Sequence, residues 1–230
     1  MGSQPRLIEV RKSVLKKNDL TARALREQFR AAGVFVVSLV SSPGSGKTLF
    51  LEKTLTQLRH TYRVAALVGD LATENDAVRL ARSQAPVKQI TTGTLCHLEA
   101  AMVQNAVQEW NLHQLDFLFI ENVGNLVCPS SYDLGEASKI VLLSVTEGED
   151  KPLKYPSIFF KSDLFVLTKI DLLPYVPFDA EAAEANARLV HPEIEIVRAS
   201  STTEGGLDGW LAWLKQRMAQ ARQGGLAVAN

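Results

Sequence analysis

Cysteine is scarce in this sequence, with two among 230 residues. Two thiols cannot build the disulfide framework of a small secreted protein, so we expect a reducing compartment and a cytoplasmic location. Long apolar runs are lacking too: the stretch 33–40 is far too short to cross a bilayer, and the basic N-terminal residues are followed by no signal-peptide core. The 25 Lys and Arg residues balance 25 Asp and Glu residues. We therefore expect neither a nucleic acid nor a membrane as partner.

Short apolar runs rich in β-branched residues recur along the chain and predict buried strands. They lie at 34–40, 63–68, 87–91, 117–121, 139–145, 164–167 and 194–197. Helix-compatible stretches separate most of them, at 49–59, 76–83, 95–110 and 179–189, and one at 207–222 follows the last. This alternation predicts one α/β domain over residues 33–222 with a doubly wound, mostly parallel sheet. Residues 1–32 should form a helical extension, interrupted near Asn18-Asp19, and 223–230 a flexible tail.

The first predicted strand leads into Ser41-Ser42-Pro43-Gly44-Ser45-Gly46-Lys47-Thr48 and then into a helix. This is the phosphate-loop (P-loop) pattern, with Ser41 where the first glycine is usual. Backbone N–H groups freed by the glycines surround a β-phosphate, Lys47 reaches the β- and γ-oxygens, and Thr48 offers a hydroxyl to Mg²⁺. The expected nucleotide-binding residues here are Pro43, Gly44, Ser45, Gly46, Lys47, Thr48 and Leu49.

A second motif indicates which base is bound. The strand at 164–167 ends in Thr168-Lys169-Ile170-Asp171, which matches the [N/T]-K-x-D pattern of guanine-specific P-loop proteins. The Asp171 carboxylate would accept hydrogen bonds from guanine N1–H and the exocyclic amine together, a pair of donors that adenine lacks in this arrangement. Lys169 would cover the base or brace the phosphate loop. These residues predict GTP rather than ATP as the ligand.

Carboxylates that could support Mg²⁺ stand at two strand ends. Asp70 ends the second strand and Glu121 the fourth, and with the Thr48 hydroxyl they form the expected magnesium site. Glu121 to Gly124 sits where many GTPases have D-x-x-G, so Gly124 would sense the γ-phosphate. Asp76 begins the next helix and is either a helix-dipole partner or a water-positioning residue. Lys47, Asp70 and Asp76 are the candidate catalytic residues.

Both cysteines fall beside the nucleotide motifs. With Thr94 as N-cap, Cys96 and His97 would occupy the first turn of a helix, where the exposed N–H groups favour a thiolate. Adjacent helical residues point about 100° apart, so this pair alone is poorly placed to chelate an ion. Cys128, in a loop, and a second subunit would complete a shared Zn²⁺ or Ni²⁺ site at a dimer interface. The alternative is two small buried thiols and a surface histidine.

The motifs together resemble the HypB family over residues 6–220, most specifically in the stretch 121–129. The other matching segments are 42–48, 69–70, 73–77, 92–98, 147–148, 154–156 and 168–172. The resemblance implies a P-loop GTPase of the SIMIBI class that dimerises with nucleotide and binds nickel or zinc through Cys96, His97 and Cys128. It also implies assistance to nickel insertion into [NiFe]-hydrogenase, with other maturation proteins and the hydrogenase large subunit as partners.

Two segments depart from the family pattern. Ser200-Ser201 resembles the S-A loop that touches guanine O6, with Ser201 in place of the usual alanine. Residues 1–32 contain none of the cysteines or histidines with which some members bind or store nickel, so the G-domain site is the only metal site expected.

Three other functions fit parts of the sequence. A UreG-like urease accessory GTPase would carry a C-P-H triplet in the corresponding region, which this sequence lacks. A small-molecule kinase would prefer ATP, against the Thr168–Asp171 motif. A non-enzymatic, metal-bridged nucleotide-binding dimer would bind metal identically in every nucleotide state.

Overall fold

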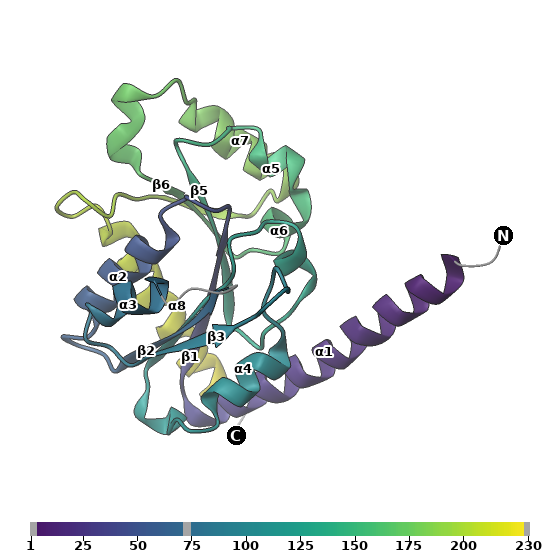
Figure 1. Cartoon of the computed structure of the whole chain (residues 1–230). Helices are drawn as coiled ribbons and strands as arrows, with labels where there is room; N and C mark the ends of the chain where they lie inside the picture. Colours follow the sequence, from purple (N-terminus) through teal and green to yellow (C-terminus); the bar gives the residue numbers. More distant parts are fainter. Residues whose placement is uncertain (1–3, 71–74, 228–230) are drawn as a thin grey trace.

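The computed structural model describes residues 4–70 and 75–227 of the chain, and in them one parallel sheet forms the centre (Figure 1). Its seven strands are β1 (Phe35–Ser41), β2 (Val64–Asp70), β3 (Val87–Thr91), β4 (Phe117–Glu121), β5 (Ser138–Ser144), β6 (Leu164–Thr168) and β7 (Glu195–Arg198). They lie in the order β3-β2-β4-β1-β5-β6-β7 and every pairing is parallel. The predicted α/β fold with its mostly parallel sheet is confirmed.

Helices cover both faces of this sheet (Figure 1). They are α1 (Gln4–Ala32), α2 (Lys47–Leu58), α3 (Asn75–Ala81), α4 (Ala100–Val107), α5 (Lys151–Lys154), α6 (Pro156–Phe160), α7 (Ala180–Val190) and α8 (Asp208–Ala227), with 3₁₀ turns η1 (Leu112–Gln114), η2 (Cys128–Ser131) and η3 (Ile170–Tyr175). Alternate residues of a strand face opposite sides of the sheet. Accordingly Val37 packs with α2 and α8, whereas its neighbour Val36 packs with α1 and α4.

The central strand β1 lies where the strand order of the sheet reverses. It pairs with β4 on one side and β5 on the other, so the chain order reverses around it. All its residues are buried, as its continuous apolar run predicts. Ligands of open α/β sheets bind in the crevice outside the carboxyl ends of the strands at such a reversal. Because β1 ends at Ser41, the phosphate loop that follows lies at that crevice, beside Glu121 at the end of β4.

Three expectations about helices are wrong. The helix α1 runs from Gln4 to Ala32 without the interruption expected near Asn18, because Asn18 is buried against the body of the protein and its side chain is bonded there. The helix expected at 95–110 begins only at Ala100. The last helix continues past 222 to Ala227, into the segment expected to be a tail.

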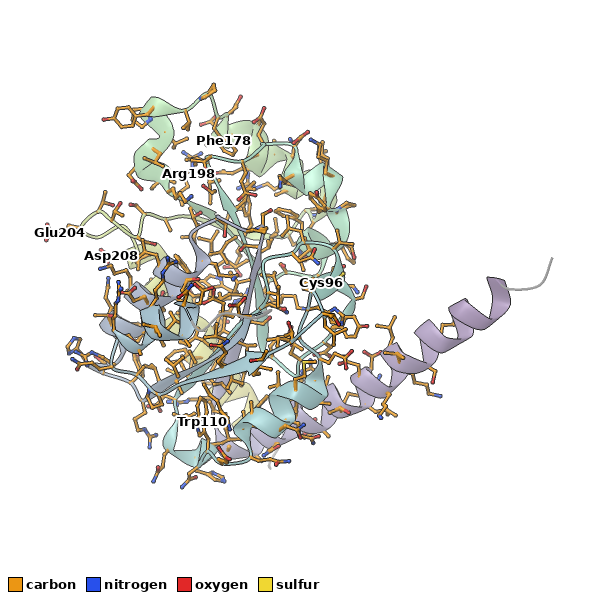
Figure 2. All side chains as sticks on the ribbon, viewed as in Figure 1. Cys96, Trp110, Phe178, Arg198, Glu204 and Asp208 are labelled. Carbon is orange, nitrogen blue, oxygen red and sulfur yellow. The ribbon has the colours of Figure 1, made fainter. Side chains whose placement is uncertain are left out.

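Cys96 and the start of α8 lie on opposite faces of the sheet. Cys96 lies on the side of the sheet that α1 and α4 cover, opposite to Asp208 at the start of α8 (Figure 2). Among the residues that the structure describes, no helix combines the length and apolar character needed to cross a membrane.

A candidate nucleotide site beside a pair of cysteines

The phosphate loop has the backbone that its glycines predict. Gly44 and Gly46 have φ angles of +78° and +88°, a region that residues with a side chain rarely adopt. A Cβ on Gly46 would also lie 3.3 Å from Lys169 Cε. The serine at the first position of the motif has a contact of its own, because the Ser45 hydroxyl donates to Ser41 Oγ at 2.6 Å. This hydrogen bond, which a glycine could not accept, tightens the loop.

Glu121 joins the phosphate loop to the end of β4. Its Oε1 accepts hydrogen bonds from Lys47 Nζ at 2.8 Å and from Thr48 Oγ1 at 2.7 Å. The carboxylate is fully buried, and Oε2 has no hydrogen-bond partner within the described residues. A buried, partly unsatisfied carboxylate next to a hydroxyl is an oxygen-rich donor set of the kind that suits Mg²⁺. The expected magnesium residues Thr48 and Glu121 are thus in contact.

The two aspartates proposed for catalysis lie in different settings. Asp70 is the last residue of β2, and β2 pairs with β4 so that Val68 is the register partner of Glu121. Asp76 lies in the first turn of α3, where it forms an ion pair with Arg79 at 3.7 Å. That arrangement suits the helix-dipole interpretation of Asp76. The intervening residues 71–74, which include Thr73 of the family pattern, lie outside the described part of the chain.

The base-reading residues form a connected group. Thr168 Oγ1 donates to the Ser45 carbonyl at 2.8 Å and Lys169 Nζ donates to the Gly44 carbonyl at 2.7 Å, so both brace the phosphate loop. Lys169 has a φ of +59°, which turns the chain sharply into η3. At the other end, Asp171 Oδ1 accepts a hydrogen bond from Ser200 Oγ at 2.6 Å.

The second loop of the base site contributes hydroxyls to Asp171. Thr202 Oγ1 donates to Asp171 Oδ2 at 3.2 Å, while Ser201 lies half-buried between the two hydroxyl donors. The hydrogen bond from Ser200 lowers the pKa of Asp171 below its ordinary value. The carboxylate is therefore held ionised and oriented, ready to accept from two N–H groups.

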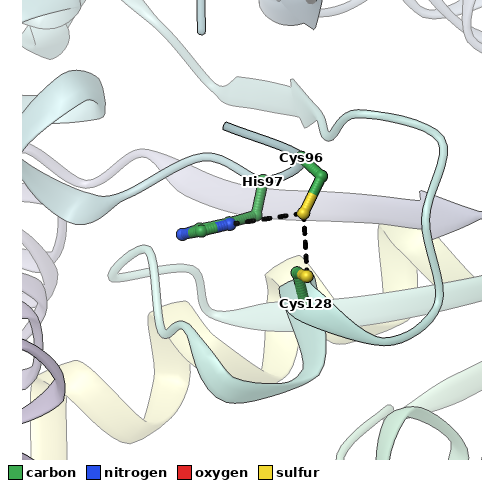
Figure 3. Close-up of side chains that lie close together, drawn as sticks. All are labelled: Cys96, His97 and Cys128. Carbon is green, nitrogen blue, oxygen red and sulfur yellow. Dashed lines mark hydrogen bonds between the residues drawn. The ribbon is translucent and has the colours of Figure 1, made fainter. Parts of the chain in front are cut away.

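The two cysteines and the histidine meet in one chain (Figure 3). Cys96 Sγ lies 2.8 Å from Cys128 Sγ and 4.0 Å from His97 Nδ1, and the three donor atoms fall within 4.8 Å of one another. Both cysteines are free thiols of intermediate exposure. The expected helical placement of Cys96 and His97 is wrong, and with it the inference that they diverge. Because α4 begins at Ala100, the non-helical backbone at 96–99 lets both side chains turn to the same point.

The imidazole of His97 is held on three sides. The residue is 7% exposed, and its ring stacks on Tyr132 with centroids 3.9 Å apart. Nδ1 faces the thiols, while Nε2 lies 3.6 Å from Glu99 Oε1. Burial lowers the pKa of His97, although Glu99 acts in the opposite direction. An imidazole stacked on Tyr132, with a carboxylate 3.6 Å from Nε2 and two thiols on the Nδ1 side, is a donor set that fits a soft or borderline ion such as Ni²⁺ or Zn²⁺.

Two segments carry these donors, and asparagines tie them together. We call residues 92–99 the Cys96 loop and residues 122–137 the Cys128 loop. Asn122 Oδ1 accepts from Leu98 N at 3.1 Å, and Asn125 Nδ2 donates to the Cys96 carbonyl at 3.3 Å. From α1, Asn18 joins the Cys128 loop to Ala100, the residue that directly follows the Cys96 loop. Sequence reasoning missed the roles of Glu99, Tyr132 and Asn18, because each acts through a contact that no local spacing reveals.

Both loops also touch the nucleotide side of the sheet. A Cβ on Gly124, in the Cys128 loop, would lie 3.2 Å from Pro43 of the phosphate loop. A Cβ on Gly69, next to Asp70, would lie within 3 Å of the Leu98 side chain in the Cys96 loop. The Asp70 carbonyl accepts from Thr92 N at 2.9 Å. Each cysteine loop is thus in close contact with a strand end or loop expected to serve the nucleotide.

Comparison with known proteins agrees with this geometry. The sequence model of the CobW/HypB/UreG nucleotide-binding domain matches residues 35–198. The hydrogenase maturation factor HypB of Azotobacter chroococcum mcd 1 is 49% identical over 223 residues, which cover 96% of this chain and 72% of that protein. The crystal structure of HypB from Helicobacter pylori in complex with nickel superposes with a TM-score of 0.84 at 41% identity, covering 89% of this chain and 96% of that one.

More distant structures share the fold alone. The signal recognition particle 54 kDa protein from Aeropyrum pernix K1, solved in complex with GDP, has a TM-score of 0.56 at 15% identity over 84% of this chain and 50% of that one. This likeness concerns the overall fold and agrees with the predicted P-loop architecture. The phosphate loop, the paired cysteines and the extent of the sequence match lead to one assignment: the chain belongs to the HypB family of CobW/HypB/UreG nucleotide-binding proteins.

Proposed function

We propose that this protein is a cytoplasmic, GTP-hydrolysing metallochaperone that binds nickel and assists its insertion into [NiFe]-hydrogenase. The observation that carries the proposal is the Cys96–His97–Cys128 donor group. Its residues lie on two loops, which contact Asp70 and Pro43 of the expected nucleotide site. The relatives named hydrogenase maturation factor and the nickel complex of the Helicobacter pylori protein support the choice of cargo and pathway. Zinc suits the same donors and is the alternative ion.

In the proposed hydrolysis, water attacks the γ-phosphate. Lys47 and a magnesium ion held by Thr48, Asp70 and Glu121 would neutralise the charge that develops on the phosphate oxygens. Backbone N–H groups from Gly44 to Leu49 would surround the phosphates, and Asp76 would act at the start of α3 as a helix-dipole partner. Lys47 would exchange its contact with Glu121 for the phosphate oxygens, which leaves the carboxylate to the magnesium ion. No glutamine or arginine finger is assigned, so we expect slow intrinsic turnover.

Guanine would be selected by Asp171. Its two oxygens, oriented by Ser200 and Thr202, would accept from guanine N1–H and the exocyclic amine. The Lys169 side chain packs close to Gly46, and its Nζ donates to the Gly44 carbonyl. Lys169 would therefore connect base recognition to the phosphate loop. Ser201 would contribute a backbone N–H to guanine O6, the role of the usual alanine.

The γ-phosphate would control the metal site through the two cysteine loops. Gly124 touches Pro43, and its neighbour Asn125 bonds the Cys96 carbonyl, so a shift at the phosphate loop would reach both cysteines through one short segment. Loss of the γ-phosphate would move the Cys128 loop relative to the Cys96 loop and release the ion.

Dimerisation with GTP is the remaining part of the proposal. Leu95 and Val127 flank the two cysteines and are 36% and 59% exposed, an apolar rim around the donor group. A second copy covering this rim would bring two more thiols and an imidazole to a shared site. Other maturation proteins and the hydrogenase large subunit would then receive the ion.

Native mass spectrometry with nickel tests the proposal. The protein is measured with GDP and with a non-hydrolysable GTP analogue, alongside Cys96→Ser and Cys128→Ser. We expect a nickel-carrying dimer with the GTP analogue, a changed metal stoichiometry with GDP, and loss of nickel in both variants while GTP hydrolysis persists. A monomer free of nickel in both nucleotide states would overturn the metallochaperone proposal, and absence of GTP hydrolysis would overturn the enzymatic part.

A further inference from the structure

Asn18, in the middle of α1, contacts the Cys128 loop and the first residue of α4, which directly follows the Cys96 loop. Its Nδ2 donates to the Asp133 carbonyl in the Cys128 loop at 2.8 Å. Its Oδ1 accepts from the N–H of Ala100, the residue directly after the Cys96 loop, at 2.8 Å. The side chain is 6% exposed, so both hydrogen bonds are shielded from water. One amide therefore satisfies the first N–H group of α4 and a carbonyl of the Cys128 loop.

The contact with Ala100 fixes where α4 begins. The first N–H groups of a helix have no partner inside the helix, and the preceding residue Glu99 makes no side-chain cap here. Asn18 supplies the missing acceptor from another helix. Because α4 starts at Ala100 and not earlier, Cys96 and His97 stay in the non-helical backbone that lets their donor atoms converge. The cap is thus linked to the geometry of the donor group.

The contact with Asp133 fixes the other loop next to the imidazole. Asp133 directly follows Tyr132, whose ring stacks on His97. The Asp133 carboxylate is separately held by Arg26 of α1, a salt bridge that lowers its pKa despite the opposing effect of burial. The carbonyl that Asn18 binds lies on the same residue. The helix α1 therefore holds the Cys128 loop through two independent side chains.

Apolar side chains also hold α1 on the body of the protein. Ala22, Leu25 and Phe29 are buried in the cluster that α1 forms with α4 and the sheet. Removal of the Asn18 amide should leave this apolar contact in place and release only the polar tie between the loops. Asn122 and Asn125 still bridge the loops from within, so we expect the effect of the change to be partial.

We propose that Asn18 is a positioning residue for the metal site, which makes α1 a component of that site. This inference rests on the nickel-binding role proposed above. Residues that orient the ligands of a metal typically change its affinity by about 10- to 100-fold when they are replaced. We expect Asn18→Leu, which keeps the branched shape of the side chain and removes both hydrogen bonds, to weaken nickel binding within this range and to leave nucleotide binding unchanged.

Competition titration of Ni²⁺ against a chromophoric chelator measures the affinity, and the thiolate-to-nickel absorption band reports the coordination. Asn18→Leu should bind nickel about 10-fold or more weakly with a shifted band. Asn18→Asp keeps the acceptor for Ala100 but places a carboxylate against the Asp133 carbonyl, so it should also bind nickel more weakly. It serves as the second variant if Asn18→Leu does not fold. Arg23→Ala, on the exposed face of the same helix, should match the wild type.

A further variant tests whether a general loss of stability would by itself weaken nickel binding. Leu214→Ala removes buried volume on α8, on the opposite face of the sheet, and should lower the thermal midpoint without changing nickel affinity or the band. Two results would overturn the positioning role, provided that Cys96→Ser still abolishes nickel binding. One is wild-type nickel affinity in both Asn18 variants, and the other is an equal loss of nickel affinity in Leu214→Ala. A wild-type protein that binds no nickel through thiolate would overturn the proposed metal function and this inference together.

Discussion

Lys47 Nζ lies 2.8 Å from Glu121 Oε1, so the lysine of the phosphate loop is paired with the residue at the end of β4. Both side chains are almost fully buried, and the Cys128 loop begins at the next residue. A phosphate that attracts Lys47 competes with this pairing. The contact therefore links the charge at the nucleotide site to the start of a loop that carries a metal donor.

Glu121→Gln tests this link. The amide still accepts from Lys47 but carries no charge, so we expect Mg²⁺-dependent GTP hydrolysis to fall by about 100-fold, as for loss of one group that stabilises transition-state charge. GDP without magnesium should bind at least as tightly as to the wild type, because Lys47 is released more readily. Single-turnover hydrolysis and GDP titration measure the two effects. Glu193→Gln, at an exposed site, is the matched control, and equal Mg²⁺ dependence in both variants would contradict the assignment.

Asp171→Asn should change the base that is bound. The carboxylate accepts two hydrogen bonds from guanine, each worth about 1.5–3 kcal/mol because the acceptor is charged, so GTP affinity should fall by at least about 100-fold. Xanthine has a carbonyl in place of the exocyclic amine, and an asparagine can donate to it. XTP hydrolysis should therefore appear as GTP hydrolysis is lost. A variant that loses both nucleotides would indicate a structural defect and not a change in base reading.

The sequence predicts the local backbone of the expected nucleotide-binding segments better than that of the segment with Cys96 and His97. Gly44 to Thr48 and Thr168 to Asp171 lie in short segments whose backbone is fixed by glycines and strand ends, so spacing is enough to place them. The cysteine site depends on where α4 starts. The sequence from 95 to 110 has helical character, but the N–H groups of Leu98 and Ala100 bond to the side chains of Asn122 and Asn18, and α4 begins at Ala100. The low helix propensity of asparagine predicts an interruption at Asn18, yet both ends of its amide form hydrogen bonds within the fold.

Gly69→Ala should disturb the Cys96 loop from the nucleotide side. The new Cβ would lie 2.7 Å from Leu98 Cγ, and overpacking of this kind costs about 1–3 kcal/mol. We expect a lower free energy of unfolding in denaturant and, because Leu98 follows His97, weaker nickel binding. Leu98→Ala in the same background should make room for the methyl group and recover part of the stability. Additive losses in the double variant would show that the two side chains do not meet.

The ion pair of Asp116 with Arg63 predicts a pH dependence of stability. Asp116 accepts from Arg63 Nε at 3.1 Å and from the Arg63 N–H at 2.9 Å. The Arg63 side chain is the main reason that the pKa of Asp116 falls from 3.8 to about 2. A carboxyl whose pKa is lowered by folding stabilises the protein above its unfolded pKa, and this contribution is lost as the pH falls through the folded value.

Arg63→Ala should therefore destabilise the protein at pH 7, and the difference from wild type should shrink between about pH 4 and pH 2, where Asp116 becomes protonated. Arg222 also donates to Asp116, at 2.9 Å, so the loss should be partial. Urea unfolding at pH 7, 4 and 3 measures the difference, with Arg23→Ala as a control that should show no pH-dependent gap. A gap that stays constant as the pH falls would mean that Arg63 acts through packing, since only an electrostatic contribution disappears when the carboxylate is neutralised.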